Sequence, residues 1–272
     1  MQLQNIKLGF IGAGNMAEAI LRGLIDRGVV SADRMMASDP SAERRALIQK
    51  SHGIIVTGEN CEIARKSDVL ILAVKPQVMA EVLHALSPNL KSSHLLISIA
   101  AGIRTSAIDT MCGSLTSIIR VMPNTPALIG KGVSVLCAGP RAGELEMSLA
   151  AQLFKAVGEV LTVNEDAMDA VTAISGSGPA YLFYWMEAML KAAEEAGFDP
   201  DTAKKLVYGT ITGAAALADK TSEPPDTLRA RVTSKGGTTE AAIRVLNERG
   251  VGDAVVEAVR AATNRSRELS GG

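Results

Sequence analysis

The stretch Phe10-Ile11-Gly12-Ala13-Gly14-Asn15-Met16-Ala17 decides the fold. It has the form G-x-G-x-x-A, with a strand pattern before it at residues 7–11 and a helix pattern after it at residues 17–27. In this setting the first glycine allows a tight turn, the second lets a pyrophosphate approach the backbone, and the helix N-terminus offers amide donors. The alternative is an ordinary glycine-rich turn. We expect a dinucleotide to bind Gly12, Ala13, Gly14, Asn15, Met16 and Ala17.

The alternation of strand and helix continues through the first half of the chain. Further strands are expected at residues 34–38, 54–56, 69–73, 95–99, 117–121 and 133–137, and helices at 42–50, 59–66, 79–86 and 105–111. The unbroken apolar run at residues 69–72 is typical of a parallel strand covered on both faces. This pattern predicts an α/β, Rossmann-like, doubly wound domain over residues 1–163.

From residue 164 onward the chain reads as helices only, at residues 167–196, 199–219, 238–249 and 251–269. We expect an all-α domain over residues 164–272. Four of its aromatic side chains, Tyr181, Phe183, Tyr184 and Trp185, fall within five positions and would cover most of a helix circumference. Such a helix is either surrounded by its own domain or packed in a subunit interface, and we favour the interface.

Composition narrows the possible functions. Of 272 residues, 47% are hydrophobic and 21% charged, with 28 Lys and Arg against 29 Asp and Glu. This excludes a disordered chain and disfavours a nucleic-acid or anionic-membrane partner. Three scattered cysteines, no signal-peptide pattern at residues 1–7 and an apolar stretch at 95–103 too short to span a bilayer predict a cytoplasmic protein with no metal site.

Asp39 indicates which dinucleotide is preferred. It stands at the expected end of the second strand, where a carboxylate hydrogen-bonds the adenosine ribose of NADH and repels the 2′-phosphate of NADPH. Pro40 follows, and the nearest arginines, Arg44 and Arg45, fall on the next helix. We expect NADH to be preferred over NADPH. The alternative is that Asp39 only opens an Asp-Pro turn.

Two further loops follow buried strands and should line the same ligand, because ligands bind at the carboxyl ends of parallel strands. The first contains Lys75, which could equally be a solvated loop residue. The second is made of small residues suited to close approach. These loops are Ala73-Val74-Lys75-Pro76 and Ala100-Ala101-Gly102.

The sequence offers few groups for acid–base catalysis. No tyrosine is followed four positions later by lysine, and the histidines, His52, His84 and His94, have no acidic partner at a recognisable spacing. We expect each histidine to be a surface helix or loop residue. Reduction of a C=N bond suits such a site better than reduction of C=O, since a cyclic imine is readily protonated.

The densest polar stretch of the second half runs from residue 232 to 240 and leads into a helix. Thr238 or Thr239 could cap that helix, and its free amides would bind an anion such as a substrate carboxylate; an ordinary capped junction is equally compatible. Glu165 either complements a helix dipole, which local evidence favours, or contacts substrate. Residues 175–179, with two glycines and a proline, could form a kink or a close-contact surface.

Together these motifs resemble the pyrroline-5-carboxylate reductase family. The resemblance spans nearly the whole chain, and the combination of MPNTP at 122–126, SGSGPAY at 175–181 and GGTT at 236–239 is specific. It implies hydride transfer from NAD(P)H to the imine carbon of 1-pyrroline-5-carboxylate, giving L-proline, the last step of proline biosynthesis. It also implies a helical domain that forms an intertwined homodimer, with dimers able to assemble further.

The resemblance also assigns residues. It implies that Ser234, Gly237, Thr238 and Thr239 hold the substrate carboxylate, that Thr239 lies near the ring nitrogen as a candidate proton donor, and that Glu165 lies near the substrate. It implies cofactor contacts at Asn60, Ala73, Val74, Lys75, Pro76, Ala100 and Ala101. Two departures stand out. Lys235 replaces the family's usual proline, and Asp39 replaces a small neutral residue, which puts the common use of NADPH in doubt.

Two other functions fit parts of the pattern. A hydroxy-acid dehydrogenase on the same scaffold would need a catalytic lysine soon after a glycine-rich helix start, yet none follows Gly178 until Lys191. A non-catalytic dinucleotide sensor could share the glycine motifs, but would not need the carboxylate loop. Both are weaker interpretations than an imine reductase.

Overall fold

The computed structural model describes residues 5–271. The expectation that residues 1–7 carry no signal peptide therefore falls partly outside the described residues. The chain divides into two compact units. The first contains the residues up to Ser177 together with those from Ala262 onward, and the second is Gly178–Ala261. The domain boundary expected after residue 163 stays a prediction.

The first unit is built on one eight-stranded sheet in the order β3-β2-β1-β4-β5-β6-β7-β8. Neighbouring strands are parallel except β6 and β7, which are antiparallel. The doubly wound α/β class is thereby confirmed, and one strand, β8, had not been expected. The strands are β1 (Leu8–Ile11), β2 (Met35–Ser38), β3 (Ile55–Thr57), β4 (Val69–Leu72), β5 (Leu95–Ser98), β6 (Ser117–Met122), β7 (Gly132–Ala138) and β8 (Gly158–Thr162).

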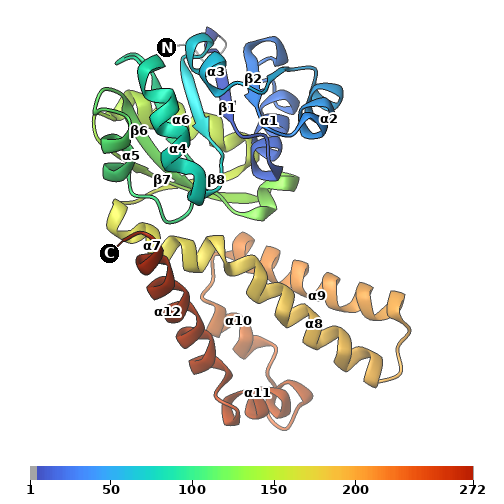
Figure 1. The fold of residues 1–272 in the computed structure, drawn as a ribbon. Helices are drawn as coiled ribbons and strands as arrows, with labels where there is room; N and C mark the ends of the chain where they lie inside the picture. The colour runs from blue at the N-terminus through green and yellow to red at the C-terminus, as the bar shows by residue number, and fades with distance from the viewer. Residues whose placement is uncertain (1–4, 272) are drawn as a thin grey trace. The chain divides into compact units, whose positions relative to one another are not determined.

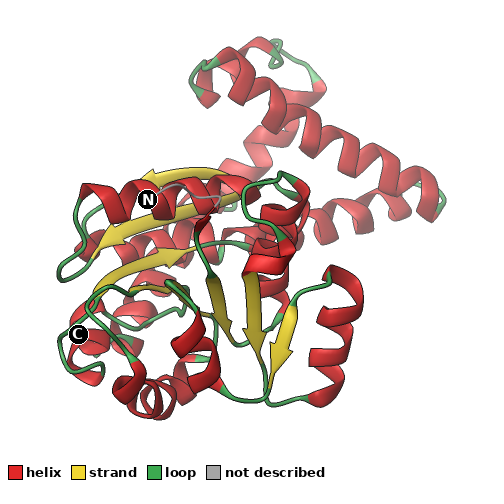
Figure 2. Ribbon diagram, turned by 90° about the horizontal axis from the view of Figure 1, so that it is seen from above, coloured by secondary structure: helices red, strands yellow, loops and turns green. Residues whose placement is uncertain are grey.

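Helices cover both faces of this sheet (Figures 1 and 2). Two separate apolar clusters result, one containing side chains of α1, α2 and α6, the other side chains of α3, α4 and α5. Every residue of β1, β2, β4 and β5 is buried, as expected for parallel strands covered on both sides. The helices are α1 (Asn15–Asp26), α2 (Ala42–His52), α3 (Asn60–Lys66), α4 (Met79–Leu86), α5 (Thr105–Met111) and α6 (Glu144–Phe154).

The second unit is helical, and α8 and α9 run antiparallel to each other (Figure 1). Within the single chain the aromatic stretch of α8 is not covered: Phe183 is 55% exposed, Tyr184 75% and Trp185 40%. The interpretation of α8 as a helix enclosed by its own domain is therefore wrong. The helices are α8 (Gly178–Glu195), α9 (Pro200–Thr221), α10 (Pro225–Arg231), α11 (Thr238–Glu248) and α12 (Val251–Leu269).

The chain passes from the first unit into α8 through an irregular helix. After α7 (Met168–Val171), residues Thr172–Gly176 form a π-helical turn, closed by the bond from Ser177 N to Thr172 O at 2.8 Å. A Cβ built on Gly176 would lie 2.4 Å from Met122 Cε. Gly176 thus packs closely against β6 of the same chain, while a close-contact surface beside the substrate stays a prediction.

The end of α12 returns to the first unit. Ser266 donates a hydrogen bond of 2.7 Å to Asp169 Oδ1, and both residues are buried. Leu269 approaches Gly102, whose φ of 71° is in the left-handed region that favours glycine. The last turns of α12 therefore belong to the first unit, where Ser266 is buried.

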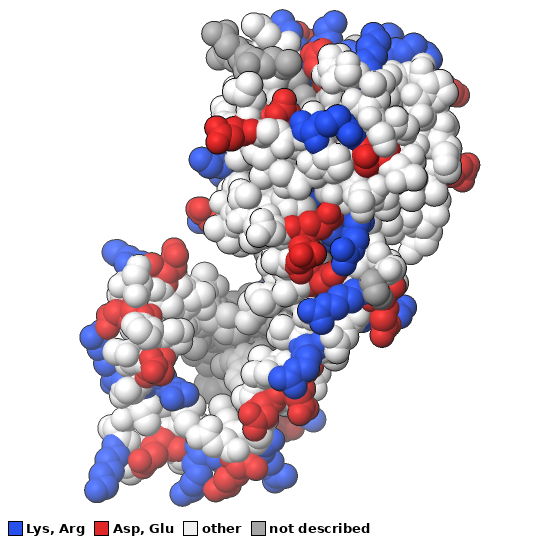
Figure 3. Space-filling model, turned by 90° about the vertical axis from the view of Figure 1, so that its left-hand side faces the viewer, with Lys and Arg blue, Asp and Glu red and all other residues white. Residues whose placement is uncertain are grey.

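All three cysteines are free, and two of them are buried. Burial raises the pKa of the Cys112 thiol to about 12 and that of Cys137 to about 11. Among the described residues, no helix is long and apolar enough to cross a membrane. Lys and Arg are interspersed with Asp and Glu over the face drawn in Figure 3, consistent with a net charge of -1.

Candidate active site

The phosphate loop has the backbone that its glycines predict. Gly12 follows β1 with a φ of 93°, and a Cβ on it would lie 2.7 Å from Ala73 O. Gly14 is the N-cap of α1, where a Cβ would meet no atom within 4 Å and no side chain caps the helix. The first amides of α1 are thus available to an anion, and the loop fits a pyrophosphate. Ala17 is buried in the core, as close helix packing requires.

The other expected cofactor loops lie along the same edge of the sheet. Ile11 pairs with Ser38 on one side and Leu72 on the other, and Leu72 pairs with Ser98, so four neighbouring strands end in register. The order β3-β2-β1-β4-β5 reverses direction between β1 and β4, the position at which doubly wound sheets bind nucleotides. The structure therefore brings together the loops with Gly12–Ala17, Asp39, Ala73–Pro76 and Ala100–Ala101.

Asp39 does more than open a turn. Its Oδ2 accepts a hydrogen bond from Ala13 N at 3.1 Å, and its Oδ1 accepts one from Ser41 N at 2.9 Å. The carboxylate is thereby fixed against the phosphate loop. Asn60 is held nearby, because Ser38 Oγ donates to Asn60 Oδ1 at 2.7 Å. Both side chains lie at the carboxyl end of β2.

A group of charged side chains joins α1 to α2 beside this edge, and the sequence did not predict it. Arg44 Nη2 lies 2.5 Å from Glu18 Oε2, and His52 Nε2 lies 3.1 Å from Glu18 Oε1. Burial raises the pKa of Glu18, but the hydrogen bonds with His52 and Arg44 outweigh burial and lower it below its usual 4.5. His52 therefore has an acidic partner after all.

His94 also differs from expectation. It is 5% exposed rather than a surface residue, and its Nδ1 accepts a hydrogen bond from Lys91 N at 3.0 Å. Burial lowers the pKa of the imidazole, helped by the charge of Lys91, so the neutral form is favoured. All three histidines were expected to be surface residues, and of the three only His84, on α4, is exposed.

Glu165 connects three elements of the first unit. Its Oε1 accepts from Thr105 N at 2.7 Å and its Oε2 from Thr105 Oγ1 at 2.6 Å. Arg120 Nη1 lies 3.4 Å from Oε1, and the Arg120 side chain is 2% exposed. Both carboxylate oxygens thus have partners within the protein. The side chain is nevertheless 22% exposed, and Glu165 lines a surface pocket together with Ala138 and Thr162.

The carboxylate loop of the second unit has a free helix N-terminus. Gly237 is the N-cap of α11, with no side-chain hydrogen bond at the cap, so the expectation that Thr238 or Thr239 caps the helix is wrong. Both threonines instead begin the helix. Gly237 N donates to Ser234 O at 3.0 Å, and a Cβ on Gly237 would lie 2.4 Å from Ser234 Oγ. The loop is tight, and its first helical amides are free to bind an anion.

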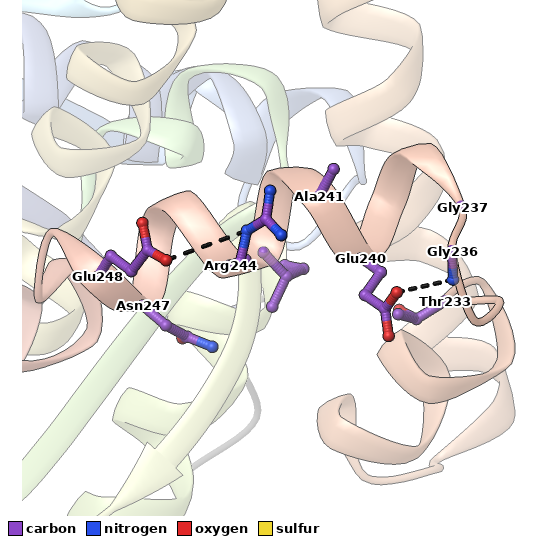
Figure 4. Close-up of a pocket in the computed structure, with 9 residues that line it drawn as sticks. Thr233, Gly236, Gly237, Glu240, Ala241, Arg244, Asn247 and Glu248 are labelled. Carbon is purple, nitrogen blue, oxygen red and sulfur yellow. Dashed lines mark hydrogen bonds and ion pairs between the residues drawn. The ribbon is translucent and has the colours of Figure 1, made fainter.

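A hollow of about 720 Å³ borders this loop along α11 (Figure 4). Gly236 N donates to Glu240 Oε2 at 2.7 Å, which fixes one wall, and Gly236 has a φ of 74°. Of the expected substrate residues, Gly237 lines this hollow. Ser234, Thr238 and Thr239 are adjacent to it in the chain but are not among its lining residues.

Comparisons with known proteins match both parts of the chain. The family described as pyrroline-5-carboxylate reductase dimerisation matches residues 165–269, and the family described as NADP oxidoreductase coenzyme F420-dependent matches residues 7–102. A prephenate dehydrogenase of A. aeolicus, 13% identical with a TM-score of 0.56, shares the fold alone. Neither the hydroxy-acid dehydrogenase nor the sensor interpretation gains support.

Several proteins that are similar to nearly the whole chain carry the name of the same enzyme. A pyrroline-5-carboxylate reductase of Pseudomonas aeruginosa is 44% identical, over 97% of each chain. The solved reductase of Coxiella burnetii is 38% identical with a TM-score of 0.91, over 98% of this chain and 99% of that one. That of Plasmodium falciparum, solved with NADP bound, is 32% identical with a TM-score of 0.90, over the same shares. Because its similarity to these reductases covers nearly the whole sequence, from the phosphate loop at Gly12–Ala17 to α11 and beyond, this chain belongs to the pyrroline-5-carboxylate reductase family.

Proposed function

We propose that the protein reduces the C=N bond of 1-pyrroline-5-carboxylate, giving L-proline in the last step of proline biosynthesis. The observation that carries this proposal is the similarity to reductases of that name over 97% of the chain, since the dinucleotide cradle alone would fit many oxidoreductases. The decisive experiment is loss of NADH or NADPH absorbance when 1-pyrroline-5-carboxylate is added to the purified protein. Cofactor binding without reduction of the imine would refute the proposal.

The first unit supplies the cofactor site. The amides of α1 would hold the pyrophosphate at Gly12–Ala17, while Asn60, Ala73–Pro76 and Ala100–Ala101 would contact the rest of the dinucleotide. When bound, the nicotinamide supplies the hydride. The two glycines support this fit. A Cβ on Gly12 would collide with the backbone of Ala73, and the space beside Gly14, where a Cβ would meet no protein atom, is left open for a ligand.

We infer that NADH is preferred over NADPH. The Asp39 carboxylate is fixed beside the phosphate loop by two backbone amides, and a 2′-phosphate next to it would be repelled. The relative from Plasmodium falciparum was solved with NADP bound, so the inferred NADH preference is argued from Asp39 of this chain and not from that relative. Comparing kcat/KM for both cofactors tests it, and Asp39→Ser should weaken the preference. An unchanged NADH-to-NADPH ratio in that variant would refute the role of Asp39.

The second unit would supply the carboxylate site. The free amides at the start of α11, with Ser234, Gly237, Thr238 and Thr239, would bind the substrate carboxylate, and Glu165 would contact the substrate. Thr239 would hydrogen-bond the ring nitrogen as a proton donor. Most of the catalysis is then positioning of a substrate that is already easily protonated. Thr239→Ala should raise KM or lower kcat and leave folding intact; full activity would refute its role.

We further infer a homodimer, or a larger homo-oligomer built from dimers, formed through the helices of the second unit. Exposed Phe183, Tyr184 and Trp185 support this, because a monomer rarely leaves so many neighbouring aromatic side chains in water. The mass in solution tests the inference, and a strictly monomeric protein would refute it. We place the protein in the cytoplasm, on the strength of its three scattered, free cysteines.

A further inference from the structure

A charged cluster of Arg44, Glu18 and His52 joins α1 to α2 and contacts the phosphate loop at Ala13. Arg44 is in the first turn of α2, and its guanidinium contacts Ala13 in the phosphate loop and Glu18 on α1. Its Nε donates to Ala13 O at 2.5 Å, and its Nη2 lies 2.5 Å from Glu18 Oε2. The guanidinium is therefore held across the loop that the dinucleotide would contact.

Glu18 is itself fixed from both sides. One of its oxygens contacts Arg44 and the other lies 3.1 Å from His52 Nε2 at the end of α2. The three side chains are only 10–28% exposed, so water screens the attraction less than it would for a surface pair. Glu18 thus neutralises Arg44 and also sets the direction in which it points.

The position of Arg44 matters for cofactor choice. Enzymes of this fold that use NADP place an arginine near the ribose, where it pairs with the 2′-phosphate. The other nearby cation, Arg45, donates to the backbone carbonyls of Asp39 and Pro40, and no carboxylate among the described residues pairs with it. Of the two arginines, Arg44 is thus the one whose charge an acidic side chain already neutralises.

We propose that Glu18 is a specificity-determining residue, which holds the Arg44 guanidinium on α1 and so withholds it from a 2′-phosphate. The inference rests on the proposed dinucleotide function and adds to Asp39 a second reason for NADH preference. Asp39 repels the 2′-phosphate directly, whereas Glu18 removes the cation that would attract it. Glu18 acts through Arg44 and does not need to touch the cofactor.

The test is calorimetric titration of the full-length protein with NADP⁺ and with NAD⁺. Glu18→Ala frees Arg44, and we expect its Kd for NADP⁺ to fall roughly tenfold, the gain of a charge-assisted bond to phosphate, while the Kd for NAD⁺ changes less than about twofold. Glu18→Gln keeps a neutral acceptor for Arg44 and should give a smaller gain. Glu43→Ala is the matched control, because it removes the same charge from the exposed residue next to Arg44.

A double-mutant cycle separates the proposed mechanism from a general change in charge. In an Arg44→Ala background, Glu18→Ala should leave the Kd for NADP⁺ unchanged. The proposal is overturned if folded Glu18→Ala shows the parent's ratio of the two Kd values, if Glu43→Ala gives an equal gain, or if the gain persists without Arg44.

The parent protein tests the proposed function separately. A parent that favours NADP⁺ would contradict the NADH preference, while the tenfold shift on Glu18→Ala would still support the role of Glu18. A parent that binds neither dinucleotide would overturn both proposals.

Discussion

Replacing Glu165 should lower stability substantially, whatever its role toward substrate. Glu165→Ala removes the carboxylate that contacts Arg120, whose side chain is 2% exposed. The other terminal nitrogen of Arg120, Nη2, is already buried with no hydrogen-bond partner among the described residues. The variant also removes the acceptor for both Thr105 N and Thr105 Oγ1. A buried cation and two donors would lose their partner together.

The magnitude follows from burial. Removing one partner of a buried ion pair costs about 3–5 kcal/mol. Glu165 is 22% exposed and lies 3.4 Å from Arg120, so we take the lower end, about 3 kcal/mol. Glu165→Gln keeps an oxygen that can accept from Thr105, and we expect it to lose roughly half as much. Thr105→Val removes one hydroxyl donor and should cost about 1 kcal/mol.

Urea unfolding followed by circular dichroism measures these differences, and the slope of the transition should stay constant across the series. In thermal melts the loss for Glu165→Ala corresponds to a lower Tm by roughly 6–12 °C. A loss below about 1 kcal/mol would refute the structural role deduced from these contacts. Kinetics on the folded variant then reports the substrate role separately, since contact with substrate predicts a raised KM.

Three further outcomes follow from the same geometry. Gly12→Ala should destabilise the fold by about 1–3 kcal/mol through backbone strain and contact with Ala73 O, whereas Gly14→Ala should leave stability intact and weaken NADH binding, as urea unfolding and calorimetry would show. In the native protein only the half-buried Cys61 should react promptly with a thiol reagent at mildly alkaline pH, and all three cysteines should react once the chain is unfolded. Because the folded pKa of Glu18 lies below its unfolded value of 4.5, the stability that it contributes is present above pH 4.5 and is lost as pH falls through the folded pKa. The difference in urea midpoint between the parent and Glu18→Gln should therefore shrink on acidification, and a constant difference would contradict the assignment.

The first unit could be predicted largely from sequence because its signals are local. Strand β4 is predicted by its unbroken apolar run. The turn after β1 is predicted by Gly12, whose φ of 93° only glycine adopts readily. Strand β8 is not predicted because none of its residues, Gly158–Thr162, is buried, so the sequence shows no long apolar run there. Helix α6 was missed too, although its start at Glu144 carries acidic residues suited to a first turn.

The side-chain network of the site could not be predicted in the same way. Glu165 meets Thr105 from 60 positions away, and Glu18 meets His52 from 34 positions away. No periodicity connects such partners, because their separation depends on which strands are neighbours in the sheet. The prediction that His52 has no acidic partner is wrong for this reason, because its partner Glu18 lies on another helix.

Asp39 and Glu18 illustrate the difference between features that a local sequence pattern predicts and features that depend on contacts between residues distant in the sequence. Residues that any dinucleotide must approach act through backbone shape, so a short pattern such as G-x-G-x-x-A marks them in the sequence. The choice between NADH and NADPH instead depends on a single phosphate and on where one guanidinium points. Here that direction is set by a carboxylate one turn into α1 and a histidine at the far end of α2. We therefore expect cofactor preference to respond to substitutions at residues such as Glu18 that do not touch the cofactor, while the motif that binds the cofactor stays the same.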